Sequence, residues 1–378
     1  MIRVLNILTD TNIGGAGRLL VNYLRNFDRA EFETAVVLPA GSALKPCVEE
    51  AGYPVIEIQN GRDRSMDFAA MREVQQIIRE WKPDIVHTHS AFYGKLAAYL
   101  CGVKSRFYTR HSAFPPSRKL TTFPGRQING FVNNTLATDI VAVAQAAADN
   151  MTDTGVDAKK ITVIINGVDE MRRTTDAERT SLKQSLGIAD GTFVCGISAR
   201  LEPYKGHSYL LDTMKTVLET HPGTVLLVIG GGSCDRELKE QAKSLGIAEN
   251  VRFTGFVDDV APYYNIMDLN LNCSWGTETS CLALSEGMSL HVPAVATTYG
   301  GNPYMITEGV NGLLVPEKDS AAMAAAIVKI MDDPDLRRSL ADGAREMYEK
   351  KFTAAAMTRQ LEELYRKSVA RWRKTPQK

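Results

Sequence analysis

Short apolar runs alternate with helical patterns along almost the whole chain, and this alternation restricts the possible folds more than any other feature. Residues 4–8 have the composition of a buried strand, and apolar residues then recur at helical spacing over residues 19–27. Similar strand–helix pairs continue to residue 164 and begin again at residue 193. Repeated units of this kind predict parallel sheets that bind ligands at the carboxyl ends of their strands. We therefore expect an α/β protein with two doubly wound domains and a cleft between them.

Composition excludes several classes of protein. The 378 residues include 44 basic and 44 acidic side chains, whereas a general nucleic-acid-binding protein is normally basic. The six cysteines form no C-x-x-C pair, which indicates free thiols in a reducing cytoplasm. No apolar run approaches the roughly 20 residues needed to span a bilayer, and the N-terminus has the pattern of a first strand, not of a signal peptide. We expect a cytoplasmic protein without a nucleic-acid partner.

A glycine-rich turn follows the first strand. The sequence Gly14-Gly15-Ala16-Gly17 precedes the first helix, and glycines in such a turn let backbone N–H groups approach a phosphate or a sugar. The turn lacks the full G-x-G-x-x-G spacing, so a tight turn that binds no ligand is equally compatible with it.

Histidines lie near the ends of two later strands in the first half. His87 and His89 alternate within one strand and could face the same side, but no third ligand lies at a metal-binding spacing. His111 ends the next strand and is the stronger candidate for a site residue, with a hydrogen-bonded structural histidine as the alternative.

Residues 104–138 combine basic and aromatic side chains without an acidic one. Such a segment could meet an anionic membrane surface or a phosphate-bearing acceptor. A solvated basic loop is the alternative. The basic residues are Lys104, Arg106, Arg110, Arg118, Lys119 and Arg126, and the aromatic ones include Phe114, Phe123 and Phe131.

The second half contains a strand–loop–helix stretch over residues 272–290 with two glutamates eight positions apart. Thr279 and Ser280 are candidate N-caps, which would place Glu278 just before the helix and Glu286 about two turns along it. A helix N-terminus suits a phosphate, whereas a carboxylate beside it is better suited to accept hydrogen bonds from sugar or ribose hydroxyls. A helix with an ordinary N-terminal acid and one exposed glutamate is the alternative.

The ordered set of motifs resembles the family-4 glycosyltransferases over nearly the whole chain. The motifs are Gly14-Gly15-x-Gly17, His111, Arg200-x4-Lys205-Gly206, Glu278-x7-Glu286, Gly300-Gly301 and the run from Asn311 to Val315. The resemblance implies the GT-B architecture, in which two Rossmann-like domains face each other. It implies domains at residues 1–170 and 171–352, and a last helix within 353–378 that crosses back to the first domain.

The resemblance also implies a reaction, in which a sugar moves from a nucleoside-diphosphate sugar, here expected to be a UDP-sugar, to a lipid-linked or polysaccharide acceptor. Family members usually retain the anomeric configuration and need no metal or other cofactor. The catalytic residues implied are His111, Arg200, Lys205 and Glu278, with the two cations on the donor diphosphate and the glutamate on sugar hydroxyls. The donor-binding residues implied are Gly15, Gly17, Gly232, Val257, Ser280 and Glu286.

The chain departs from the family pattern at a few positions. Thr279 follows the first glutamate where many members have glycine, and Gly287-Met288 follows the second. These differences bear on which sugar is accepted. They do not by themselves indicate an inactive protein, because both acids and both cations are present. An epimerase or hydrolase of the same fold and a catalytically silent partner protein remain alternatives. A nicotinamide dehydrogenase is disfavoured, since the second strand does not end in an acid.

Overall fold

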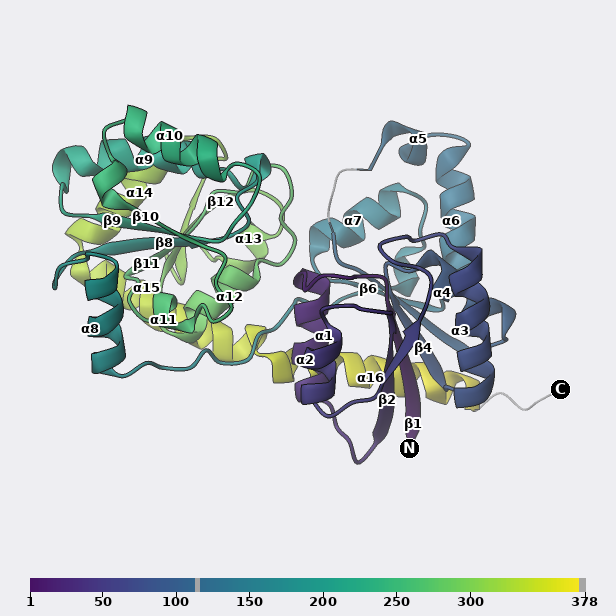
Figure 1. The fold of residues 1–378 in the computed structure, drawn as a ribbon. Coiled ribbons are helices and arrows are strands. Elements are labelled where there is room, and N and C mark those ends of the chain that lie inside the picture. The colour runs from purple at the N-terminus through teal and green to yellow at the C-terminus, as the bar shows by residue number, and fades with distance from the viewer. Residues whose placement is uncertain (113–115, 374–378) are drawn as a thin grey trace. The chain divides into compact units, whose positions relative to one another are not determined.

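The structure is a computed structural model that describes residues 1–112 and 116–373. The chain forms two compact units, each built on one parallel sheet (Figure 1). One unit comprises Met1–Asp169 together with helix α16 (Ala354–Arg373), and the other comprises Glu170–Thr353. Both are Rossmann-like, which confirms the predicted α/β class.

The first unit contains a seven-stranded sheet among its described residues, in the order β3-β2-β1-β4-β5-β6-β7. All neighbouring strands are parallel. The chain runs outward in one direction from β1 to β3 and in the other from β4 to β7, so the strand order reverses between β1 and β4. The strands are β1 (Ile2–Leu8), β2 (Phe32–Pro39), β3 (Val55–Ile58), β4 (Ile85–His89), β5 (Ser105–Arg110), β6 (Asp139–Ala142) and β7 (Ile161–Val163).

Helices cover both faces of this sheet, because alternate strand residues enter two different cores. Val4 packs with Leu20 of α1 and Tyr365 of α16 on one face, whereas Leu5 packs with Val74 of α3 on the other. The helices are α1 (Gly15–Arg25), α2 (Lys45–Glu50), α3 (Phe68–Trp81), α4 (Phe92–Leu100), α5 (Arg118–Thr121), α6 (Gly125–Leu136), α7 (Gln145–Asp153) and the 3-10 turn Ala158–Lys160, besides α16.

The second unit contains a six-stranded parallel sheet in the order β10-β9-β8-β11-β12-β13. Here the strand order reverses between β8 and β11. The strands are β8 (Val194–Ser198), β9 (Val225–Ile229), β10 (Val251–Gly255), β11 (Leu269–Asn272), β12 (Ala294–Thr297) and β13 (Gly312–Val315).

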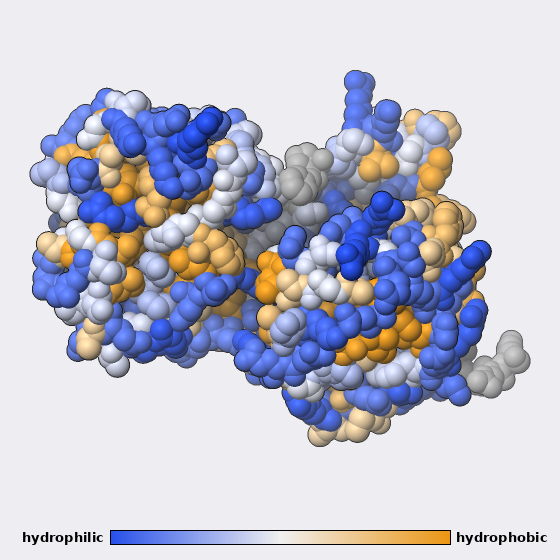
Figure 2. Space-filling view, viewed as in Figure 1, coloured by the Kyte–Doolittle hydropathy of each residue, from blue (hydrophilic) through white to orange (hydrophobic). Residues whose placement is uncertain are grey.

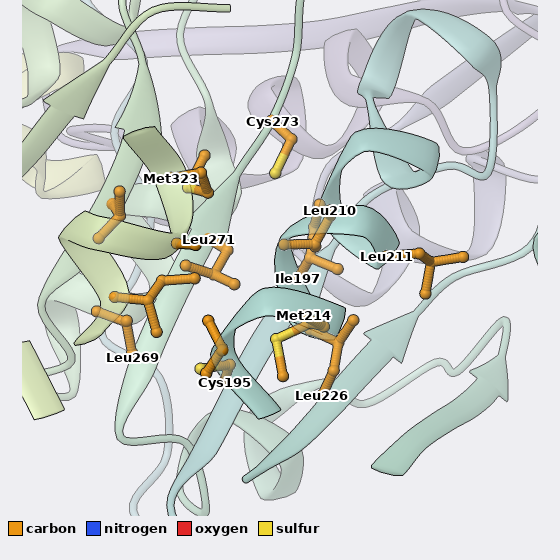
Figure 3. Packing of buried hydrophobic residues seen from close by; sticks show 14 of the residues in the cluster. Cys195, Ile197, Leu210, Leu211, Met214, Leu226, Leu269, Leu271, Cys273 and Met323 are labelled. Atoms are coloured by element: carbon orange, nitrogen blue, oxygen red, sulfur yellow. The ribbon is translucent and has the colours of Figure 1, made fainter. Parts of the chain in front are cut away.

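The main core of the second unit lies between one face of this sheet and helices α9 and α14. Figure 3 shows Ile197 and Leu226 of the sheet beside Leu210 and Met214 of α9, all of them buried. The helices are α8 (Asp176–Ser185), α9 (His207–Thr220), α10 (Asp235–Ser244), α11 (Ala261–Tyr264), α12 (Leu282–Ser289), α13 (Asn302–Met305), α14 (Ser320–Asp332) and α15 (Pro334–Met347), with 3-10 turns at Pro203–Lys205 and Ala248–Asn250 and a π-helical turn at Tyr348–Phe352.

Two local predictions differ from the structure. Part of the expected basic loop at residues 104–138 is helical, as α5 and α6, while Phe114 lies outside the described residues. Helix α12 begins at Leu282 and its N-cap is Cys281, so the prediction of Thr279 or Ser280 as the N-cap was wrong. Glu286 is consequently the fifth residue of α12, little more than one turn along it.

Candidate functional site

The reversal of strand order in the second sheet brings together residues from two distant loops. Lys205 follows β8, and Glu278 follows the neighbouring strand β11. Because β8 and β11 are parallel neighbours, their carboxyl ends lie at the same edge of the sheet. Lys205 Nζ donates a hydrogen bond to Glu278 Oε2 over 2.8 Å. The side chains are 17% and 8% exposed, so this ion pair is largely shielded from solvent.

The protein holds Glu278 by hydrogen bonds to only one of its two carboxylate oxygens, Oε2. Asn272 Nδ2 donates to Oε2 over 3.1 Å and Ser274 Oγ donates to it over 2.8 Å, so three donors converge on one oxygen. Within residues 1–112 and 116–373, Oε1 receives no hydrogen bond. Oε1 is therefore the oxygen that a ligand hydroxyl can approach without displacing a protein donor.

The ion pair keeps Lys205 charged. Burial by itself would lower the pKa of Lys205, but the neighbouring Glu278 carboxylate outweighs it and raises the pKa above the ordinary value. The site thus presents a fixed positive charge beside an oriented carboxylate.

Close backbone contacts hold the loop that carries Glu278. Gly206 has a φ of +77°, and a Cβ there would lie 2.0 Å from the carbonyl oxygen of Cys273. Gly300 has a φ of +61°, and its Cβ would lie 2.2 Å from the carbonyl oxygen of Glu278. The amide of Gly301 also donates to that oxygen over 3.2 Å. Only glycine fits at 206 and 300, which explains the glycines of both motifs.

Arg200 lies five positions before Lys205 and is exposed. Its Nη2 donates to the Tyr204 hydroxyl over 2.9 Å, which restrains the guanidinium in the same loop. Gly232 follows β9, where a Cβ would lie 2.4 Å from the carbonyl oxygen of Leu201. The loops after β8 and β9 therefore touch through their backbones.

Val257 follows β10, and Glu286 lies within α12. Val257 is half-buried, just beyond β10, and packs in the apolar cluster that contains Tyr264. The Tyr264 hydroxyl donates to the carbonyl oxygen of Ala283 in α12 over 3.0 Å, and burial together with the Glu286 carboxylate raises the pKa of Tyr264 well above its usual value. Ser280 is buried in the segment that precedes α12.

The first unit places its predicted residues at the corresponding edge of its own sheet. Gly15 begins α1 after β1, His89 ends β4, and His111 comes directly after β5. A Cβ at Gly15 would meet no atom within 4 Å, whereas one at Gly17 would lie 3.0 Å from a methyl group of Leu44. Gly17 thus allows α1 to pack closely against Leu44.

The two strand histidines do face the same side, and their rings stack at a centroid distance of 4.4 Å. His87 contacts the Tyr365 hydroxyl through Nδ1 and the Thr109 hydroxyl through Nε2, both at 2.6 Å. His89 contacts His111 through Nδ1. In the described part of the chain, no group of three or more His, Cys, Asp or Glu side chains is arranged to hold a metal ion.

Sequence reasoning missed the polar residues that support these candidates. Asn272 and Ser274 orient Glu278, and Asn6 lies behind His89. Asn6 and Asn272 are buried within strands, where an amide side chain is unusual. An asparagine inside a predicted apolar strand was therefore the sequence feature that could have identified them.

Two family models match the chain along most of its length. Residues 13–172 match "Glycosyltransferase Family 4" and residues 178–347 match "Glycosyl transferases group 1". The chain belongs to the family-4 glycosyltransferases. It is accordingly a glycosyltransferase enzyme, as the motif order predicted.

Individual relatives span most of this glycosyltransferase. EpsD of Bacillus subtilis (strain 168) is 25% identical over 353 residues, 91% of each chain. The Escherichia coli UDP-Gal:alpha-D-GlcNAc-diphosphoundecaprenol alpha-1,3-galactosyltransferase is 26% identical over 277 residues, 71% of each chain. Among solved structures, Anabaena HepE in complex with UDP is 23% identical with a TM-score of 0.84, covering 97% of this chain and 100% of that one. This last likeness supports the GT-B fold.

Proposed function

We propose that the protein is a retaining glycosyltransferase that transfers a sugar from a UDP-sugar to a lipid-linked or polysaccharide acceptor without a metal ion. The observation that carries this proposal is the shielded Lys205–Glu278 pair, in which a fixed cation adjoins a carboxylate with one uncommitted oxygen. A nucleotide sugar has a matching pair of groups, an anionic diphosphate and a hydroxyl-bearing sugar.

The cations have a direct role in the proposed reaction. Breaking the bond between the sugar and the diphosphate leaves extra negative charge on the leaving phosphate. Arg200 and Lys205, placed in one loop, would stabilise that charge in place of a metal. Losing one such cation is expected to cost about 3 kcal/mol of transition-state stabilisation, roughly a hundredfold in rate.

The remaining residues are assigned to the other parts of the donor. Glu278 Oε1 accepts hydrogen bonds from the sugar hydroxyls, and Glu286 accepts them from the ribose. Gly232 and Val257 contact the nucleotide, Ser280 and Gly15 lie near the phosphates, and His111 contacts the donor sugar. We assign no covalent nucleophile and no general base to a side chain; the leaving phosphate takes the proton of the acceptor.

Two relatives support the choice of substrates. HepE has been solved with UDP and with UDP-glucose. The name of the Escherichia coli relative gives UDP-Gal as its donor and a diphosphoundecaprenol-linked GlcNAc as its acceptor. Uridine is therefore our choice of base, and a lipid-linked glycan our choice of acceptor.

A panel of UDP-, GDP- and ADP-sugars tests the donor. We expect slow nucleotide release from one UDP-sugar, unchanged by a chelator and lost in Glu278→Gln and Glu286→Ala. Glu240→Ala, which removes an exposed acid from α10, is the control and should retain release. A hydrolase would be favoured if free sugar were the sole sugar product even with acceptors present. An epimerase would be favoured if the product were an epimerised nucleotide sugar. No release and no thermal stabilisation by any donor would favour the catalytically silent partner.

The acceptor part of the proposal draws on an exposed apolar patch in the first unit. We define the α5–α6 patch as Leu120, Phe123, Ile128 and Phe131, which are 40%, 82%, 61% and 73% exposed. Figure 2 shows hydrophobic residues among hydrophilic ones over α5 and α6. Apolar side chains this exposed on two consecutive helices and in the turn between them favour a binding surface.

The charges around the α5–α6 patch favour an anionic membrane as its partner. Arg118 and Lys119 of α5 are exposed beside it. Arg106 and Arg126 instead turn their guanidiniums toward backbone carbonyls, so fewer of the basic residues face outward than the sequence suggested. Exposed cations next to inserted aromatic side chains suit a surface of anionic lipids. Among the described residues, every helix is too short or too polar to cross a bilayer.

Sedimentation with phosphatidylglycerol vesicles tests this contact. We expect binding at low salt, release at high salt, and at least a tenfold loss of binding in the Phe123→Ser/Phe131→Ser variant, because each inserted phenylalanine contributes about 2 kcal/mol. Phe68→Ser removes a similarly exposed phenylalanine from α3 and is the matched control. Equal binding by the patch variant and the control would overturn the membrane assignment.

A further inference from the structure

The loop that follows β12 contributes a buried side chain to the hydrogen bonds around Glu278. Asn302 begins α13 and is fully buried. Its side-chain amide lies 3.0 Å from the backbone carbonyl oxygen of Thr297 and 3.1 Å from Asn272 Oδ1. A carbonyl oxygen only accepts hydrogen bonds, so the Asn302 atom that faces Thr297 must be the donor, Nδ2. The same Nδ2 therefore also donates to Asn272.

The orientation of Asn272 is fixed in the same way. The backbone N–H of Ser274 donates to Asn272 Oδ1 over 3.0 Å. An N–H group only donates, so this end of the Asn272 amide must be the oxygen, and Nδ2 is the end that faces Glu278 Oε2. Asn302 and Ser274 thus hold the acceptor end of Asn272, while its donor end holds the Glu278 carboxylate.

A second route joins Asn302 to the same carboxylate oxygen. The Thr297 hydroxyl donates to the carbonyl oxygen of Ser274 over 2.6 Å. A hydroxyl has one proton, so Thr297 Oγ1 can only accept from Asn302 Nδ2, at 3.3 Å. Ser274 Oγ in turn donates to Glu278 Oε2 over 2.8 Å. Both routes therefore end on Oε2, and neither uses Oε1.

Stability alone does not account for an asparagine at this position. Within residues 1–112 and 116–373, Asn302 Oδ1 has no hydrogen-bond partner although it is buried. A buried carbonyl group without a partner destabilises the folded state. An apolar side chain of the same size would avoid that cost, but it could not donate to Asn272 and Thr297. What asparagine provides here is the donor group.

We propose that Asn302 is a positioning residue for the glycosyltransferase reaction, which acts through Asn272 and Ser274 to fix the rotation of the Glu278 carboxylate. With Oε2 held in place, Oε1 has a single position from which to accept a hydrogen bond. That its ligand is a hydroxyl of the donor sugar rests on the proposed function. The preceding residue, Gly301, donates to the backbone carbonyl oxygen of Glu278, so this loop holds both the backbone and the side chain of the glutamate.

Carbon-13 NMR of the full chain, labelled at the glutamate carboxyl carbon, tests the positioning without a substrate. The Glu278→Gln variant assigns the signal of Glu278. In Asn302→Leu, which keeps the size of the side chain, we expect this signal to shift or broaden, because the Asn272 amide becomes free to turn away from Oε2. An unchanged Glu278 signal in Asn302→Leu would overturn the proposal.

Two further variants keep this test decisive. Asn265→Leu is the matched control, because Asn265 Nδ2 also donates to two backbone carbonyl oxygens but the residue precedes β11 and lies at the opposite edge of the sheet. It should leave the Glu278 signal unchanged, and an equal change in this control would show a general loss of packing and overturn the assignment. If Asn302→Leu fails to fold, Thr297→Val removes one of the two routes in a side chain of the same shape. We then expect a smaller shift of the signal, and no shift would again overturn the proposal.

Kinetics with an active donor test the consequence for the reaction. We expect kcat/KM for the donor to fall about tenfold in Asn302→Leu, while the Kd of UDP, which has no sugar, stays within about twofold of wild type. In a Glu278→Gln background, Asn302→Leu should lower the residual kcat/KM no further, because it acts through that carboxylate. Equal losses for UDP and the donor, or a tenfold loss that persists in Glu278→Gln, would contradict the positioning of Glu278. No turnover of any nucleotide sugar by the wild type would contradict the proposed function instead, and the NMR result would still decide the role of Asn302.

Discussion

Lys205 and Glu278 are 73 positions apart in the chain, and their side chains meet at 2.8 Å where the strand order of the second sheet reverses. Breaking a buried pair leaves its partner without compensation. In Lys205→Met we therefore expect the free energy of unfolding to fall by about 3 kcal/mol and nucleotide release to slow by roughly a hundredfold. Denaturant unfolding and the release assay measure the two effects.

Two variants control for this result. Adding Glu278→Gln to Lys205→Met should restore much of the stability, but not the activity, because the uncompensated charge is removed. Lys239→Met breaks an exposed pair with Asp235 and should change neither quantity appreciably. Full activity in Lys205→Met would rule out the proposed role of this lysine.

The stability contribution of Lys205 should depend on pH at the alkaline end only. Its pKa in the folded protein is raised above the ordinary value of 10.5, so the folded state holds this proton more tightly than the unfolded state. The contribution is then fully present below pH 10.5 and is lost as the pH rises through the higher, folded value. We expect the stability difference between wild type and Lys205→Met to be constant from pH 7 to about pH 10 and to shrink above it. A difference that shrinks between pH 7 and 9 would contradict a raised pKa.

The buried histidines should destabilise the first unit in acid. Burial, assisted by the charge of His111, lowers the pKa of His87 from 6.5 to about 3. Below pH 6.5 the unfolded state binds the proton and the folded state resists it, so stability falls as the pH falls toward 3. At pH 5.5 the loss from His87 alone is about 1 kcal/mol. Comparing wild type with His87→Gln at pH 7 and pH 5.5 measures it, and an equal change in both proteins would contradict the assignment.

Gly300 should be sensitive to a single added methyl group. Gly300→Ala would place a Cβ 2.2 Å from the carbonyl oxygen of Glu278, so we expect the Glu278 loop to shift and kcat/KM for the donor to fall at least tenfold. Gly309 has a similar φ of +72°, but a Cβ there would meet no atom within 4 Å. Gly309→Ala should therefore cost about 1 kcal/mol of stability and leave kcat/KM unchanged. Equal effects on kcat/KM would show that backbone strain, not contact with the loop, is responsible.

Much of the fold could be predicted from local patterns, because helix and strand periodicities are properties of neighbouring residues. Residues 4–8, predicted as a buried strand, lie within β1 (Ile2–Leu8). Prediction failed where a tertiary contact replaces a local signal. Cys281, not Ser280, caps α12, and its thiol instead accepts from Asn272 Nδ2 over 3.0 Å. Helix α6 was missed although Ile128, Phe131 and Val132 recur at helical spacing within it, because the segment was interpreted by its charge and aromatic content.

The sequence by itself determined which residue types stand at the ends of the strands, and hence the chemistry available at each sheet edge. Only the tertiary structure decided which of them meet. Lys205 reaches Glu278 because β8 pairs with β11 although β9 and β10 separate them in the chain, and His111 reaches His89 because β5 pairs with β4. Strand order is set by long-range packing of the sheet and its helices, which no local spacing encodes.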